Sequence, residues 1–230
     1  MTNYLKILNE VKELSRKYDK STNAVTLLSV SKLHSYEEIL DAYSDGARLF
    51  GENHVQEIVE KFPLPGDRPE GMKVYMIGHL QTNKVKKVVP LVDRIESVDS
   101  IKLLNAINKE CGKIEKKMDI LFEINSSGEE QKSGFRTEEE LVEALAVAKS
   151  SKWVNLIGFM TVGPLGFDKE KNIEAFKGVK LLYDKYKTSS FKVLSMGMSA
   201  DKEEAISCGS TECRIGSAIF GARDYGKKTC

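Results

Sequence analysis

Eight short runs rich in Val, Ile, Leu and Phe recur along the chain, and a stretch with helical spacing of apolar residues follows each of the first seven. The eight runs are residues 25–32, 48–53, 73–78, 94–98, 119–125, 154–160, 191–196 and 212–215. Runs of this length and composition are typical of buried parallel strands. Eight strands, each but the last followed by a helix, behind an amphipathic helix over 2–18, indicate an α/β protein with a (β/α)8 barrel. A doubly wound open sheet is the alternative, but it rarely needs eight such regular units.

Composition narrows the class of protein further. At 230 residues the chain has the usual length of one barrel, so we expect a single domain over 1–230. The net charge is +1, which favours neither nucleic acid nor a membrane surface as a partner. No apolar stretch is long enough to span a bilayer, and residues 1–6 have no signal pattern. The four cysteines are scattered, so we expect no metal site, no disulfide framework and a cytoplasmic location.

A single lysine ends the first strand. Lys32 follows residues 25–31 and precedes a turn, and Ser35 then caps a helix. The carboxyl ends of strands are where barrels place their ligands. A lysine at this position either extends along the surface to solvent or, where burial frees its amine of a proton, attacks an aldehyde. The local sequence alone favours the first reading.

Small residues follow the last two strands. Ser195–Ser199 and Arg214–Ser217 are rich in Gly and Ser, at the position where barrels commonly hold a phosphate with backbone N–H groups and hydroxyls. One such pair is weak evidence because most are tight turns. Two pairs together with Lys32 suggest an aldehyde that carries a phosphate.

Longer motifs then resemble one family. The chain is similar to the pyridoxal phosphate homeostasis proteins, also known as proline synthetase co-transcribed homologues. The matching segments run nearly end to end: 29–32, 50–57, 77–84, 97–99, 125–130, 132–134, 158–161, 194–201 and 214–221. This resemblance implies a barrel of the alanine-racemase N-terminal-domain type (fold type III of the pyridoxal-phosphate proteins), with pyridoxal 5′-phosphate as the cofactor.

The resemblance also implies roles for residues of this chain. Lys32 would form the aldimine, Arg214 would face the pyridine nitrogen, and Asn53 would lie near the ring. The phosphate would be held by Ser195, Gly197, Gly216 and Ser217. His79 and Met160, at the ends of the third and sixth strands, complete the candidate cofactor-binding residues. An arginine only donates hydrogen bonds, so it would leave the ring nitrogen unprotonated and the ring a poor electron sink.

Three functions remain open at this point. The first is a carrier or regulator that keeps pyridoxal phosphate available within the cell without catalytic turnover, with PLP-dependent apo-enzymes as partners and a monomeric or weakly dimeric state. The second is an amino-acid racemase, which needs an acid or base on each face of the substrate. We do not expect it, because the chain ends at Cys230 with no second domain. The third is a Schiff-base aldolase acting on a sugar phosphate. The first is our interpretation.

Overall fold

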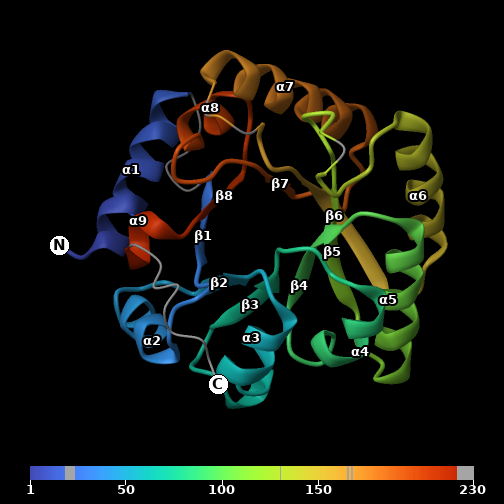
Figure 1. Cartoon of the computed structure of the whole chain (residues 1–230), viewed down its shortest axis with the longest axis horizontal. Helices are drawn as coiled ribbons and strands as arrows, with labels where there is room; N and C mark the ends of the chain where they lie inside the picture. Colours follow the sequence, from blue (N-terminus) through green and yellow to red (C-terminus); the bar gives the residue numbers. More distant parts are fainter. Residues whose placement is uncertain (19–23, 130, 165, 167, 222–230) are drawn as a thin grey trace.

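Eight parallel strands pair in chain order, and the last pairs with the first to close a barrel (Figure 1). The computed structural model describes residues 1–18, 24–129, 131–164, 166 and 168–221, so Glu130 and Cys230, which the sequence analysis included, lie outside it. The strands are β1 (Thr26–Val30), β2 (Leu49–Glu52), β3 (Lys73–Met76), β4 (Arg94–Val98), β5 (Met118–Glu123), β6 (Val154–Met160), β7 (Val193–Ser195) and β8 (Glu212–Ile215). The barrel that the sequence predicts is confirmed.

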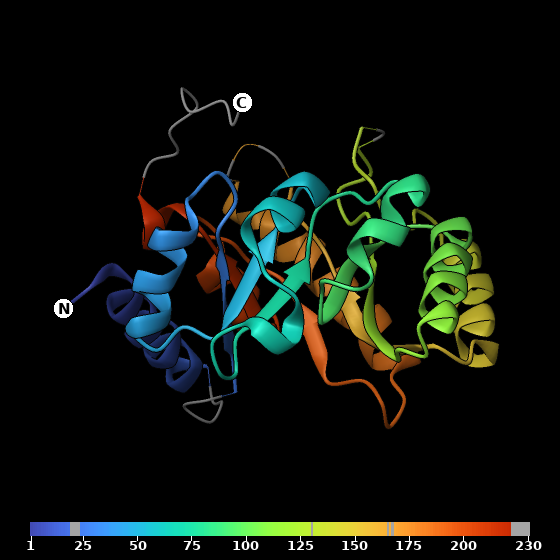
Figure 2. The ribbon, with the colours of Figure 1, turned by 90° about the horizontal axis from the view of Figure 1, so that it is seen from below.

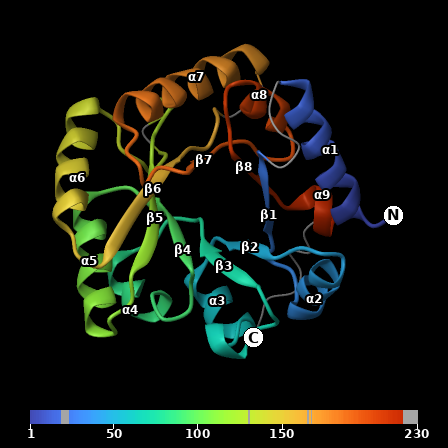
Figure 3. The same ribbon diagram turned by 180° about the vertical axis from the view of Figure 1, so that it is seen from behind.

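Helices surround this barrel, as the view from behind also shows (Figure 3). They are α1 (Asn3–Lys17), α2 (Tyr36–Ser44), α3 (Val55–Lys61), α4 (Val85–Val88), α5 (Ile101–Lys113), α6 (Glu138–Ser150), α7 (Lys169–Tyr186), α8 (Lys202–Ser207) and α9 (Ser217–Phe220), with 3-10 turns at Pro65–Asp67 and Thr82–Lys84. Thr137 forms a capping box with Glu140 at the start of α6, and Ser35 forms a second one with Glu38 at the start of α2. No helix among the described residues is long and apolar enough to cross a bilayer.

Helix α9 was not expected from the sequence. Residues 216–221 read there only as a Gly- and Ser-rich segment after the last strand, yet Ser217–Phe220 form one helical turn. This turn packs beside α1, so the first and last helices of the described chain are neighbours (Figure 1). Ile219 anchors the turn in the core that lies between strands and helices.

Alternate residues of β4 and β8 face opposite sides of the barrel wall. Ile95, Cys213 and Ile215 belong to the large apolar core beneath the helices. Their neighbours Arg94 and Glu212 form an ion pair that spans the barrel interior. The outer layer is therefore apolar, while part of the interior is filled by charged side chains.

The carboxyl ends of all eight strands open on the same side, because the strands are parallel. In Figure 2, seen from below, the loop after β5 rises on one side of the barrel. Side chains that follow the strands thus gather at a single rim, where barrel proteins bind their ligands.

Candidate functional site

Lys32 lies two residues beyond β1, at the carboxyl rim of the barrel. It stands in a turn that is closed by a hydrogen bond from the His34 N–H to the Ser31 carbonyl (3.1 Å). Leu33, the next residue, has a φ of 65°. This is the left-handed region, which side chains other than glycine seldom adopt without support from their surroundings. The backbone around Lys32 is therefore held in one unusual shape.

Arg214 on β8 is fixed inside the barrel by two hydrogen bonds. Its Nη1 donates to Ser195 Oγ (2.8 Å) and its Nη2 donates to the Thr161 carbonyl (2.6 Å). The Ser195 hydroxyl in turn donates to Glu96 Oε2 (2.9 Å). The guanidinium plane is thus set by groups on two other strand ends. The hydroxyl of Ser195 is engaged as both donor and acceptor, and its contact with a phosphate stays a prediction.

Behind Arg214 lies a cluster of buried charges. Arg94 Nη1 contacts both Glu96 Oε1 (3.1 Å) and Glu212 Oε2 (2.9 Å), and its guanidinium stands 4.2 Å from the Tyr75 ring centre. Burial, and next the Glu212 charge, raise the pKa of Glu96 to about 8 although Arg94 opposes the shift. Burial and the neighbouring Glu212 carboxylate therefore favour the protonated form of the Glu96 carboxyl. We call Arg94, Glu96 and Glu212 the interior charge cluster.

The loops after β7 and β8 are tied to each other and to β1. The Arg214 N–H donates to the Gly197 carbonyl (2.9 Å). Gly197 has a φ of 94°, and a Cβ on it would lie 2.6 Å from the Ala205 Cβ. A Cβ on Gly216 would lie 3.0 Å from the Val30 carbonyl oxygen. A larger residue at position 197 would therefore push the first loop away from α8, and one at position 216 would push the second loop away from the strand that leads to Lys32.

Two hydroxyls meet where these loops adjoin. Ser217 is exposed and begins α9, and its Oγ lies 3.5 Å from Ser199 Oγ. The Met198 N–H donates to Asp201 Oδ1 (2.6 Å), which fixes the first loop. Glycine backbone and serine hydroxyls thus form a small polar surface of the composition expected for a phosphate.

Asn53 and His79 gather on another part of the rim. Both line a 260 Å³ cavity that opens among the ends of β2, β3, β5 and β6, and whose lining includes neither Lys32 nor Arg214. His79 is 60% exposed, and its Nδ1 lies 3.1 Å from Asp99 Oδ2. Asn53 and His79 therefore line the same cavity, and their contact with a cofactor stays a prediction.

Met160 lies in the core. It is 1% exposed and packs with Leu121 and Ile157 in a small buried cluster. Its neighbour Thr161 is the residue that contacts Arg214, through its carbonyl. The end of β6 therefore serves the site through its backbone, and a cofactor contact of Met160 remains a prediction.

The interior charge cluster was not among the residues expected at the site. A signal was available for the cluster, because charged residues interrupt two strands that are otherwise apolar, at Arg94, Glu96 and Glu212. Charges at alternate strand positions are usually solvated, however, and only the closed barrel shows that these face inward.

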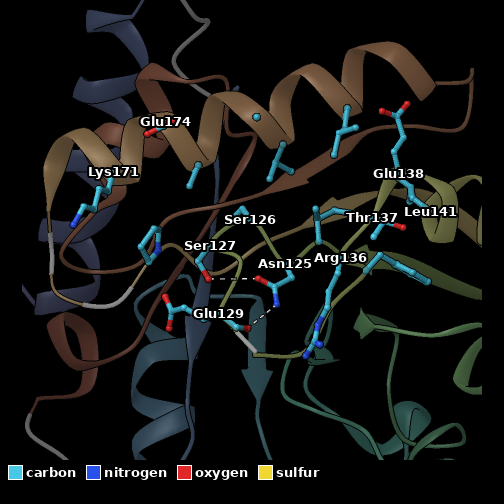
Figure 4. A pocket seen from close by; sticks show the side chains of 17 residues that line it. Asn125, Ser126, Ser127, Glu129, Arg136, Thr137, Glu138, Leu141, Lys171 and Glu174 are labelled. Carbon is cyan, nitrogen blue, oxygen red and sulfur yellow. Dashed lines mark hydrogen bonds between the residues drawn. The ribbon is translucent and has the colours of Figure 1, made fainter. Parts of the chain in front are cut away.

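A larger cavity of 670 Å³ lies between α7 and the segment that joins β5 to α6 (Figure 4). Asn125 lines this cavity, and its side-chain amide already forms a hydrogen bond within its own loop, in which Nδ2 donates to the Glu129 carbonyl (3.0 Å). None of the candidate cofactor-binding residues lines this cavity. Among the described residues, no three His, Cys, Asp or Glu side chains are grouped so that they could hold a metal ion. We therefore place the candidate site at the rim around Lys32, although this cavity is larger.

Comparisons with known proteins agree with this geometry. The model of the alanine racemase N-terminal domain matches residues 6–224. A protein of Pasteurella multocida named pyridoxal phosphate homeostasis protein is 35% identical over 229 residues, which are 98% of this chain and 98% of that protein. The solved structure of PipY from Synechococcus elongatus, with PLP bound, is 28% identical, covers 92% of this chain and 100% of that one, and has a TM-score of 0.79. Alanine racemase from Clostridium difficile, 15% identical with a TM-score of 0.75 over 97% of this chain and 57% of that one, shares the fold.

Proposed function

Because the chain belongs to the pyridoxal phosphate homeostasis protein family and carries the alanine racemase N-terminal domain fold, we propose that it binds pyridoxal 5′-phosphate covalently through Lys32 and acts as a carrier or regulator of that cofactor. The observation that supports this most is the meeting of three features at one rim. These are the Lys32 turn, the fixed Arg214 guanidinium, and the two glycine loops, of which the Gly216 loop packs on the end of β1.

The residues present fit this cofactor. When bound, pyridoxal phosphate supplies an aldehyde carbon that condenses with a primary amine, forming a C=N bond and releasing one water. Lys32 Nζ would supply the amine. Gly197, Gly216 and Ser217 would hold the phosphate with backbone N–H groups and the Ser217 hydroxyl, and glycine at 197 and 216 lets the two loops pack closely against Ala205 and Val30.

Arg214 favours binding over turnover. An arginine is always protonated and can only donate hydrogen bonds. Held by Ser195 and Thr161, it would present a donor to the pyridine nitrogen and keep a proton from that atom. A ring without that proton withdraws electrons weakly, so carbanion chemistry at a bound amino acid gains little. We therefore propose that the protein has no dedicated catalytic activity, and that apo-enzymes receive the cofactor from it in the cytoplasm. We further propose one domain and a monomeric or weakly dimeric state.

The proposal is tested on the purified protein with added pyridoxal phosphate. We expect an absorbance band near about 420 nm that borohydride bleaches, as a protonated C=N bond to lysine would give. Mass spectrometry of the digest should place the reduced adduct on the peptide that contains Lys32. A spectrum without this band, or an adduct on another lysine, would contradict the proposal. Amino-acid racemisation by the loaded protein would favour an enzyme instead.

Substitution of Arg214 by glutamine tests the role of the guanidinium. The change removes a fixed positive charge beside the pyridine nitrogen, so we expect the absorbance band to shift while the protein stays folded. The spectrum of the loaded protein and circular dichroism of the unloaded protein measure the two effects separately. Substitution of the exposed Arg16 by glutamine is the control, since Arg16 lies on the outer helix α1. An unchanged band in the Arg214 variant would show that this residue does not face the ring.

A further inference from the structure

Three charged side chains lie beneath the turn that carries Lys32. Glu52 ends β2, and Glu57 and Lys61 stand one turn apart on α3. Lys61 forms ion pairs with both carboxylates, at 3.3 Å to Glu52 Oε1 and at 2.5 Å to Glu57 Oε2. Glu52 is fully buried, and the side chains of Glu57 and Lys61 are only 14% and 15% exposed. We call these three residues the turn clamp.

The turn clamp holds the backbone on both sides of Lys32. Before it, the Ser31 hydroxyl donates to Glu52 Oε1 (2.7 Å), and Lys61 Nζ donates to the Ser31 carbonyl (3.2 Å). After it, the Leu33 N–H donates to Glu57 Oε2 (2.6 Å). Leu33 is the residue in the left-handed conformation. A charge-assisted hydrogen bond to its amide is the kind of support that such a conformation needs.

Burial makes this cluster costly for the fold. Glu52 Oε2 and Glu57 Oε1 are buried, and neither has a hydrogen-bond partner among the described residues. Desolvation raises the pKa of Glu52 to about 7 although Lys61 opposes the shift. Buried polar atoms without partners destabilise a protein, and apolar residues of the same volume are often better tolerated. Fold stability alone does not explain why these charges face the turn.

We propose that the turn clamp is a positioning device that fixes the Lys32 turn for condensation with an aldehyde, with Glu57 as its decisive member. This inference rests on the proposed function. Glu57 touches the turn backbone, so it acts on the reaction through Lys32 and stays outside the bond-forming step.

The test separates covalent capture from binding. Substitution of Glu57 by alanine removes the acceptor for the Leu33 amide. We expect formation of the Lys32 adduct to slow by about tenfold or more, because misplacing a reacting group is costly in rate. The affinity for pyridoxine 5′-phosphate, which has no aldehyde, should stay within about twofold, since the phosphate loops are untouched. Stopped-flow absorbance gives the rate, and calorimetry gives the affinity.

Two further variants sharpen the result. Glu60→Ala is the matched control, because Glu60 is an exposed glutamate on the same helix, where it contacts Gln56. It should leave rate and affinity unchanged. Adding Leu33→Gly to Glu57→Ala should restore much of the lost rate, because glycine adopts a positive φ without support. A general loss of folding would not be repaired by this change.

Two results would overturn the positioning role of Glu57. A Glu57→Ala variant that reacts at the wild-type rate overturns the positioning role, and so does an equal loss of rate and of pyridoxine phosphate affinity. If the wild-type protein forms no adduct on Lys32, the proposed function itself fails. Hydrogen exchange of the Leu33 amide in the unloaded protein then still reports on the clamp, since we expect faster exchange in Glu57→Ala and not in Glu60→Ala.

Discussion

Replacing Lys32 by alanine abolishes the borohydride-stable adduct and weakens pyridoxal phosphate binding without eliminating it. The amine is lost, so no C=N bond forms, while Arg214 and the loops at Gly197 and Gly216 remain in place. We expect the affinity to fall by roughly a hundredfold, equivalent to about 3 kcal/mol. Equilibrium dialysis measures the residual binding, and mass spectrometry after borohydride measures the adduct.

The control for this prediction is another lysine at a helix surface. Lys86 on α4 is exposed, so Lys86→Ala should keep both the adduct and the affinity. An adduct of undiminished stoichiometry in Lys32→Ala would show that a different lysine is the covalent site. Complete loss of binding in a folded Lys32→Ala protein would show that the loops after β7 and β8 do not anchor the phosphate.

Of the variants proposed here, Arg94→Met should lower the free energy of unfolding the most. Arg94 is the shared cation between Glu96 and Glu212, and their side chains are 13%, 0% and 3% exposed. Removal of one member of a buried ion cluster leaves uncompensated charge and typically costs about 3 to 5 kcal/mol. Urea unfolding, followed by circular dichroism, measures the change.

The loss should depend on pH. The pKa of Glu96 is raised to about 8 in the folded protein from an ordinary 4.5, so folding takes up a proton between these values. The contribution of Glu96 therefore lowers stability as the pH rises through this window. Without Arg94 the folded pKa rises further, so the deficit of the variant should be smaller at pH 5 than at pH 8.5. A deficit that is the same at both values would contradict the ionisation argument. Lys17→Met, which breaks an exposed ion pair with Glu203, should not shift the urea midpoint measurably.

The fold could be predicted because its signals are local. The bounds of β4, β6 and β8 match the expected strands. In each of these segments the spacing of the apolar residues differs from that in the neighbouring segments, and turn-forming residues mark its ends. Helix α9 was missed since a helix of one turn has no period of its own, and its four residues follow a Gly–Ser pair that reads as a loop.

The candidate site was predicted in part. The places of Lys32, Gly197, Gly216 and Ser217 beyond strand ends could be predicted because strand ends and small residues are visible in the sequence, and their contact with a cofactor stays a prediction. The residues that hold the site in place could not be predicted, because they come together only when strands far apart in the sequence form the barrel. Arg94 meets Glu212 across 118 positions of the chain. Alternation along a strand shows which residues share a face but not which face turns inward.

The closure of the barrel has a consequence for when the site comes into existence. Leu28 pairs with Arg214, and Ser29 with Ile215, so the strand that leads to Lys32 is hydrogen-bonded to the last strand. During synthesis the amine emerges early, while the guanidinium and the second glycine loop emerge nearly a whole chain later. Until β8 docks, β1 has one open edge and no loop of Gly216 above it. On the proposed function, a nascent chain therefore lacks the groups that would hold the ring nitrogen and part of the phosphate until β8 is in place. The cofactor site that we propose would thus exist only in molecules in which all eight strands have closed into the barrel.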